Sequence, residues 1–139
     1  MTNRPVSELC QSHIWSVQPD DPIDAVGEEM IARRLTWAPV LDSTGSLIGV
    51  ISAWDLLHMQ AKGSPGHKPA WQACTYKPLT VPPDTPVEDA ARLMRKAHVH
   101  HLLVVSPQGK LLGVVSPLDL LAGHEQWDNQ GAPALPPRP

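Results

Sequence analysis

Two short segments of the sequence place a serine and an aspartate in the same spacing. One reads GVISAWD and the other GVVSPLD. A carboxylate three residues beyond a strand-terminal hydroxyl can accept two hydrogen bonds from the cis-diol of a ribose. Ser-x-x-Asp is also a capping box, in which the serine caps a helix and the acid complements its positive end, so the pattern alone leaves both roles open. The four residues are Ser52 with Asp55 and Ser116 with Asp119.

The histidines His98, His100 and His101 are a second group that could do chemistry, as metal ligands. Adjacent residues of a strand point to opposite faces, so His100 and His101 cannot share one ion without distortion. Neither of the two cysteines belongs to a CxxC pair, which rules out a thiol-rich site. We therefore expect no metal site.

The signatures of common enzyme classes are missing from the sequence. It contains no GxxxxGK[ST] phosphate loop, no HExxH motif, no nucleophile elbow and no convincing Ser/His/Asp set. We therefore expect no catalytic residues and no enzyme activity.

The composition is ordinary for a soluble globular domain, with 42% hydrophobic and 18% charged residues in a chain of 139. The formal net charge of -3 gives no electrostatic reason to expect nucleic acid or an anionic membrane as a partner. The apolar stretches are far shorter than the roughly 20 residues that cross a bilayer. The first residues lack the apolar core of a secretory signal, so we expect a cytoplasmic protein.

The chain is an internal duplication, since it aligns with itself without a gap at a shift of 64 residues. The match is closest where Gly45, Leu47, Gly49 and Val50 repeat as Gly109, Leu111, Gly113 and Val114. Cys10 likewise falls on Cys74, and we expect each cysteine to fill the same small buried slot in its own repeat. The predicted organisation is repeat one at 1–62, a linker at 63–69, repeat two at 70–123 and a disordered Pro-rich tail at 124–139.

Within each copy the residue pattern predicts the element order β-α-β-β-α. Helices are expected to begin at Asp21-Pro22 and Thr85-Pro86, with proline at the first helical position. Because a copy of roughly 55 residues buries too little apolar surface to be comfortably stable, we expect an α/β fold in which the copies pack about a pseudo-two-fold axis. The other predicted elements span 14–17, 39–41, 47–52 and 53–59 in the first copy, and 79–81, 102–105, 111–116 and 117–122 in the second.

These features together resemble a tandem pair of cystathionine-β-synthase (CBS) domains, often called a Bateman module. The resemblance rests on Asp-Asp-Pro or Asp-Thr-Pro before the helix, on Pro39-Val40-Leu41-Asp42, and on the two Gly-x-x-Ser-x-x-Asp endings. It covers about residues 6 to 122, in both copies and in one register. The resemblance implies the paired-repeat fold described above.

The resemblance also implies a regulatory sensor with an adenosyl ligand, such as AMP, ADP, ATP or S-adenosylmethionine, in clefts between the repeats, and no required cofactor. Asp55 and Asp119 match the family's ribose-binding acid, and Ser52 and Ser116 match the neighbouring hydroxyl. The remaining expected ligand-binding residues are Ser16, Val17, Gln18, Thr36 and Trp37 from repeat one, and Thr80, Val81, Pro82, Val99, His100 and His101 from repeat two.

The two copies differ just before the second strand. Repeat two reads VHHL, close to the family's frequent VHRL, whereas repeat one reads LTWA, in which Trp37 could stack on an adenine ring. Histidine in place of arginine at His101 weakens any phosphate contact and makes it pH-dependent. We therefore favour one cleft, built from Asp119 and Thr80 with His100 or His101 near phosphate, over the cleft that uses Asp55.

The sequence is compatible with two functions. The first is a stand-alone regulatory module that forms a homodimer, binds an adenine-containing small molecule and acts on a separate, unknown protein target, because the length leaves room for a paired sensor alone. The alternative is a structural or dimerisation module that binds no ligand. Stabilisation by adenosyl ligands would separate the two.

Overall fold

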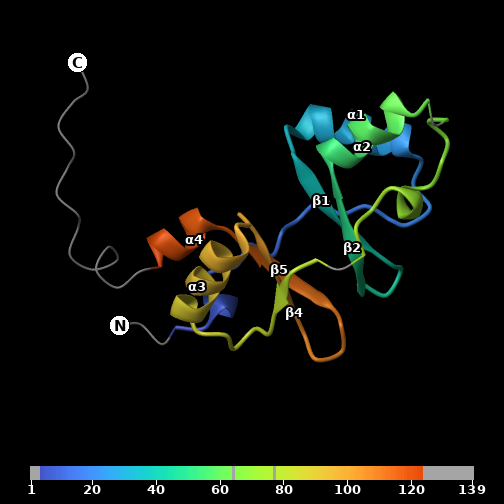
Figure 1. The fold of residues 1–139 in the computed structure, drawn as a ribbon. Helices are drawn as coiled ribbons and strands as arrows, with labels where there is room; N and C mark the ends of the chain where they lie inside the picture. The colour runs from blue at the N-terminus through green and yellow to red at the C-terminus, as the bar shows by residue number, and fades with distance from the viewer. Residues whose placement is uncertain (1–3, 64, 77, 124–139) are drawn as a thin grey trace, which may run out of the picture.

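The chain folds into two lobes of the same design, one for each repeat, with their β-hairpins meeting in the middle (Figure 1). The computed structural model describes residues 4–63, 65–76 and 78–123. The mixed α/β architecture confirms the predicted fold class. The predicted tail, 124–139, lies outside the described residues.

The first lobe packs two helices on a small sheet. Its two strands pair antiparallel, and Val17 adds a parallel bridge to Val40 in the place of a third strand. The core of this lobe is formed by buried residues such as Val26, Met30 and Ile51. The elements are α1 (Ile23–Arg33), β1 (Trp37–Leu41), β2 (Leu47–Ser52) and α2 (Ala53–Ala61).

The second lobe repeats this plan with a sheet in the order β3-β4-β5. The central strand, β4, runs parallel to β3 and antiparallel to β5, and its Leu102 and Val104 are fully buried. Near-continuous apolar strands are expected where helices cover a sheet. The elements are β3 (Thr80–Val81), α3 (Val87–Ala97), β4 (Leu102–Val105), β5 (Leu111–Val115) and α4 (Pro117–Ala122).

The long helices α1 and α3 each begin one residue later than predicted. Pro22 and Pro86 have extended backbones, with ψ of 138° and 143°, and are the N-cap residues rather than the first helical residues. The Asp21 side chain does not cap the helix, because it accepts a hydrogen bond from the backbone N–H of Gln18 at 2.9 Å. The sequence pattern therefore predicts the start of each helix one residue too early.

The leading segment of each repeat packs against the opposite lobe. The 3₁₀ turn η1 (Val6–Glu8) places Val6 in the core of the second lobe, and η2 (Ala70–Gln72) places Ala70 in the core of the first. The exchange is reciprocal, since the backbone N–H groups of Val6 and Ala70 each donate at 2.8 Å, to the carbonyls of Thr85 and Asp21. In Figure 1 the blue η1 accordingly lies beside α3.

The expectation that each cysteine fills a slot in its own repeat is wrong, for the same reason. Cys10 packs on the core of the second lobe and Cys74 on the core of the first. A Cβ atom added to Gly113 would lie 2.5 Å from the Cys10 sulfur, which shows how closely the segment approaches β5. The two slots are equivalent, but each is filled by the other repeat.

The two hairpin turns join the lobes. The Leu47 N–H donates to the Gly109 carbonyl at 3.0 Å, and the Leu111 N–H donates to the Gly45 carbonyl at 3.2 Å. These bonds are the same bond with the repeats exchanged, as a pseudo-two-fold axis requires. Gly45 and Gly109 have φ of 84° and 86°, a conformation that glycine adopts without strain.

Candidate functional site

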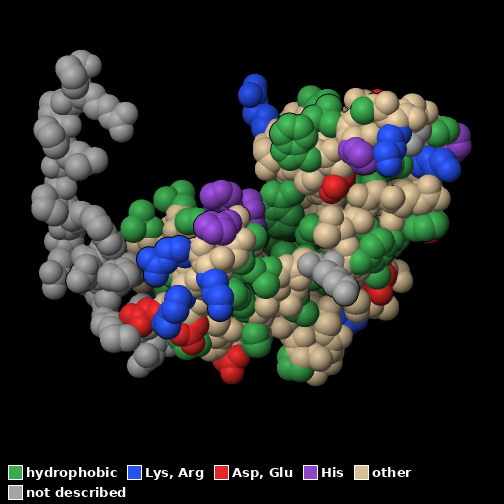
Figure 2. Space-filling view, viewed as in Figure 1, with side chains coloured by type: hydrophobic (Ala, Val, Ile, Leu, Met, Phe, Trp, Pro, Cys, Tyr) green, Lys and Arg blue, Asp and Glu red, His purple; other side chains and the backbone are tan. Residues whose placement is uncertain are grey.

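A cleft of about 460 Å³ lies where the two repeats meet. Figure 2 shows the corresponding notch between the two lobes of the surface. One wall comes from the leading segment, the end of α1 and the start of β1, and the other from β5 and the start of α4. Its polar and aromatic lining residues include Gln11, Trp15, Arg33 and Trp37 from repeat one, and His101, Ser116 and Asp119 from repeat two.

Asp119 is held rigidly at the start of α4. Its Oδ2 accepts hydrogen bonds from the backbone N–H of Ser116 at 2.8 Å and from the Ser116 hydroxyl at 2.9 Å, while the Asp119 N–H donates back to that hydroxyl at 3.3 Å. This is the predicted capping box. The second carboxylate oxygen, Oδ1, accepts from the Gln11 side-chain amide at 3.2 Å. Both residues line the cleft, so Oδ1 lies on its cleft side.

Asp55 has the same capping role in the first lobe. Its Oδ2 accepts from the backbone and hydroxyl of Ser52 at 2.8 and 2.9 Å. The position equivalent to Gln11 is Thr75, whose shorter side chain makes no bond to Asp55. The capping interpretation is thus confirmed in both copies, and only Asp119 receives a glutamine amide from the leading segment.

Trp37 and His101 occupy equivalent positions in the two repeats and touch each other. Their ring centroids are 4.5 Å apart with the planes tilted by 52°. The Trp37 Nε1–H donates to His101 Nε2 at 2.9 Å. Because the indole is only a donor, the accepting nitrogen carries no proton, and His101 is the neutral tautomer with its proton on Nδ1.

Burial favours the neutral form of His101. Desolvation lowers its pKa most, the neighbouring His100 lowers it further, and Asp119 acts in the opposite direction. The neutral ring therefore contributes stability above the usual histidine pKa near 6.5, and this contribution is lost as the pH falls through the lowered pKa of the folded protein. At neutral pH His101 offers no positive charge to a phosphate.

The cleft brings together four of the fifteen predicted ligand-binding residues: Trp37, His101, Ser116 and Asp119. Thr80, which was expected beside Asp119, does not line it. The exchange of leading segments is the reason, because it places the stretch from Gln11 to Trp15 opposite Asp119 instead.

The other predicted residues are spread over the molecule. The side chains of Val17 and Val81 are buried in the two cores. His100 lines the groove beside α3 and His101 lines the cleft, but both precede β4, which begins at Leu102, so the expectation that they lie on a strand is wrong. Of the remaining residues, Ser16 is half-buried, and Gln18, Thr80 and Pro82 are exposed. Thr36 lines a groove beside α1, Val99 lines a groove beside α3, and Ser52 and Asp55 cap α2.

Sequence reasoning missed the cleft residues of the leading segment and of the α1 end. Arg33 is the clearest case, because its guanidinium carbon lies 5.4 Å from the centre of the Trp15 ring and both residues line the cleft. The Arg33 Nε donates to the Glu29 carboxylate at 2.9 Å. A charged residue in the last turn of a helix is ordinary, so the sequence carried no signal for this role.

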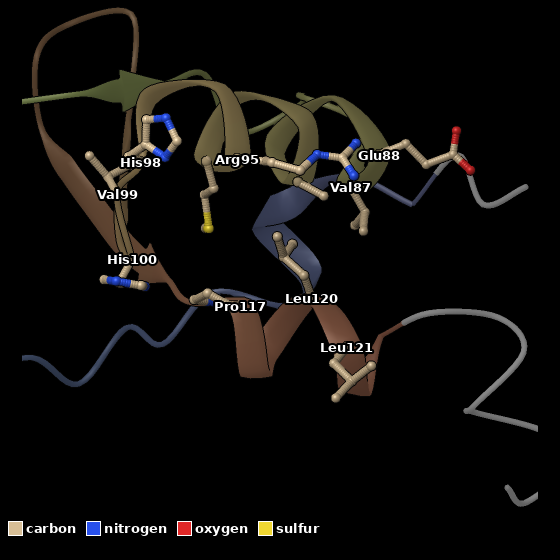
Figure 3. A pocket seen from close by; sticks show the side chains of 11 residues that line it. Val87, Glu88, Arg95, His98, Val99, His100, Pro117, Leu120 and Leu121 are labelled. Atoms are coloured by element: carbon tan, nitrogen blue, oxygen red, sulfur yellow. The ribbon is translucent and has the colours of Figure 1, made fainter.

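Two apolar grooves run along the outer helices, at equivalent places in the two repeats. The groove between α3 and α4 has a volume of about 570 Å³, and Figure 3 shows His98 and Val99 at the end of α3 and Leu120 and Leu121 on α4. Its counterpart between α1 and α2 measures about 450 Å³. Figure 2 shows histidine and basic side chains gathered on the lobe that contains α3.

The part of the chain that the structure describes contains neither a metal-binding cluster nor a membrane-spanning helix. Within residues 4–63, 65–76 and 78–123, no group of three or more His, Cys, Asp and Glu side chains is arranged to hold a metal ion. Among these same residues, the helices lack the length and apolar character needed to cross a bilayer.

Comparison with known proteins agrees with the architecture. The family model described as "CBS domain" matches residues 6–62 and 72–123. The chain belongs to the CBS domain family. It contains two CBS domains in tandem, which confirms the resemblance inferred from the repeat and its two Ser-x-x-Asp endings.

Similar proteins include other CBS pairs. The crystal structure of Arabidopsis thaliana CBSX2 in complex with AMP is 28% identical, with a TM-score of 0.77 over 86% of this chain and 94% of that one. The CBS domain protein PAE2072 from Pyrobaculum aerophilum, complexed with AMP, is 29% identical, with a TM-score of 0.71 over 84% and 89%.

Curated relatives are longer than the part that they share with this chain. Arabinose 5-phosphate isomerase KpsF of Escherichia coli O6:H1 is 32% identical over 115 residues, which are 82% of this chain and 35% of that protein. The chain spans 24%, 56% and 35% of the first three curated relatives. Since these include an acetyltransferase, a protein named for its CBS domains and an isomerase, the expectation of no enzyme activity stays a prediction.

Proposed function

We propose that this CBS pair is a regulatory module that binds an adenosyl ligand in the cleft containing Asp119. The observation that carries the proposal is a single cavity that joins a fixed carboxylate from one repeat to two indoles, Trp15 and Trp37, from the other. Its volume of about 460 Å³ falls in the range typical of small-molecule sites. The likeness to CBSX2 and PAE2072, whose structures are described in complex with AMP, supports the same ligand class.

The chemistry of the cleft suits a nucleoside. Asp119 Oδ1 can accept from the ribose hydroxyls in place of the Gln11 amide, while the capping box keeps Oδ2 fixed. An indole offers a flat apolar face on which adenine can stack, and Trp15 and Trp37 are both half-buried in the wall. The ribose would thus be read by repeat two and the base by repeat one.

A thermal-shift and calorimetric panel tests the proposal. We expect AMP, or another of ADP, ATP, S-adenosylmethionine and NAD, to raise the melting temperature in a concentration-dependent way, with GMP as the matched control for the base. A ligand at one hundred times its Kd adds about 2.7 kcal/mol to the stability of a two-state protein. If no adenine compound shifts the transition, the ligand proposal fails and the structural, dimerising module is supported instead.

We further propose that the chain forms a homodimer through the grooves of its outer helices and passes the ligand signal to a separate, unidentified protein. The exposed apolar residues Leu57 and Leu121 support this, because they are 53% and 51% exposed and each lines a groove. Apolar surface of this kind marks interaction sites when it is contiguous.

We expect the full chain to sediment as a dimer and the variant Leu57→Asp/Leu121→Asp to sediment as a monomer with an unchanged circular dichroism spectrum. Burying an unpaired carboxylate in an apolar interface is costly, so the dissociation constant of the dimer should increase at least about tenfold. The control is Leu112→Asp, which changes a residue that is 41% exposed on β5 and lines neither groove. A wild-type monomer at high concentration would contradict this prediction.

A further inference from the structure

We propose that Arg33 is the anion-binding residue of the cleft, so that the cleft selects adenosine phosphates over adenosine. This inference rests on the proposed function and deepens it by naming the class of adenosyl ligand. It concerns a residue that no sequence motif marks, at the end of a helix rather than in the VHHL segment.

The position of Arg33 ties its charge to the wall where the base is proposed to stack. Arg33 is the last residue of α1, and its guanidinium carbon lies 5.4 Å from the centre of the Trp15 ring. Arginine over an indole face is a favourable cation–π arrangement, which holds the guanidinium over one face of the Trp15 ring. A phosphate that extends from a nucleoside stacked on this wall would meet a cation already in place.

Arg33 also keeps donors available for a ligand. Its Nε donates to Glu29 at 2.9 Å, and this pair is solvent-exposed, with half of each side chain accessible. Within the described part of the chain, the two Nη groups have no further hydrogen-bond partner. The guanidinium fork matches the geometry of phosphate oxygens, and such charge-assisted bonds are about twice as strong as neutral ones.

The other ionisable groups of the cleft cannot supply this charge. They are His13, His101 and Asp119, together with His100, which precedes His101 in the sequence. His101 is held neutral by burial and by its bond from Trp37, and Asp119 is an anion on the opposite wall. Arginine alone among these keeps its charge across the physiological pH range.

The two repeats differ at this point, which makes the inference specific to one cleft. The residues equivalent to Arg33 and Trp15 are Ala97 and Leu79, so the second copy has neither the cation nor the indole at these positions. Asp55 therefore has no equivalent of this pair. The phosphate preference should belong to the cleft of Asp119.

Isothermal titration of AMP and of adenosine into the full chain tests the inference. Wild-type protein should bind AMP about tenfold more tightly than adenosine, since a half-exposed charged hydrogen bond contributes about one factor of ten. Arg33→Gln should abolish most of this ratio, because it should lower the affinity for AMP and change the affinity for adenosine by less than about twofold. Added salt should weaken AMP binding to the wild type more than to Arg33→Gln.

The control is Arg34→Gln, which removes the same charge one residue later, where the side chain lines the α1/α2 groove instead of the cleft. It should leave both affinities unchanged. If Arg33→Gln weakens AMP and adenosine equally, Arg33 only supports the wall and the inference is overturned. Equal wild-type affinities for AMP and adenosine would overturn the inference and leave the proposed function intact. If the protein binds neither AMP nor adenosine nor any other adenosyl compound, both the inference and the proposed function are overturned.

Discussion

Asp119→Asn is expected to lower the affinity for AMP about thirtyfold, whereas Asp55→Asn is expected to change it by less than about twofold. In the variant, the amide oxygen must stay in the capping box, where it accepts from the backbone and hydroxyl of Ser116. The amide NH₂ then replaces Oδ1 on the cleft side and cannot accept a ribose hydroxyl. Hydrogen bonds to a charged group contribute about 1.5–3 kcal/mol, which corresponds to the expected loss.

Asp55→Asn is a matched control for Asp119→Asn, because the two aspartates occupy equivalent positions in the two repeats. Asp55 makes the same two bonds to Ser52, at 2.8 and 2.9 Å, that Asp119 makes to Ser116. Each asparagine variant should therefore cost a similar amount of stability, about 1 kcal/mol for a weakened cap, in urea unfolding. Only the AMP affinity, measured by titration calorimetry, should separate them. A larger loss in Asp55→Asn would move the ligand to the other cleft.

The local design of the fold could be predicted from the sequence because it depends on short-range spacing. The Ser-x-x-Asp boxes, the glycine turns at Gly45 and Gly109, and the apolar strands are each specified by residues within one element or its neighbour. The duplication then predicts that two equal lobes share a pseudo-two-fold axis. These parts of the prediction are confirmed by the structure.

The exchange of leading segments could not be predicted, and the composition of the cleft depends on it. An ungapped repeat gives the same sequence pattern whether Val6 packs on its own lobe or on the other, since both cores offer an equivalent slot. The local pattern therefore identifies Asp119 but cannot say that Gln11 lies opposite to it. Arg33 was missed because its place in the cleft depends on a long-range contact between α1 and the segment that carries Trp15.

Gly49→Ala is expected to destabilise the protein by about 3 kcal/mol, because it forces the exchanged segment off β2. The new Cβ atom would clash with the Thr75 carbonyl oxygen and lie 3.1 Å from the carbonyl carbon. Thr75 exchanges two backbone hydrogen bonds with Val50, at 2.9 and 2.7 Å, so neither strand can move away without losing them. Overpacking of this kind costs about 1–3 kcal/mol, and the backbone contact places Gly49 at the upper end.

Urea unfolding of Gly49→Ala and of Gly27→Ala measures this effect against a matched control. Gly27 lies inside α1, where a Cβ atom meets only Leu56 at an ordinary 3.7 Å, so its replacement should stabilise the protein by about 0.5–1 kcal/mol. Gly113→Ala, with backbone and sulfur of the other exchanged segment within 3.0 Å, should resemble Gly49→Ala in stability. Gly113→Ala should also lower the affinity for AMP, because the residue that it displaces is Gln11, whereas Gly49→Ala leaves the Gln11 wall of the cleft intact. If Gly49→Ala were as benign as Gly27→Ala, residues 70–75 would not pack on β2, and the reciprocal exchange that builds the Asp119 cleft would be wrong.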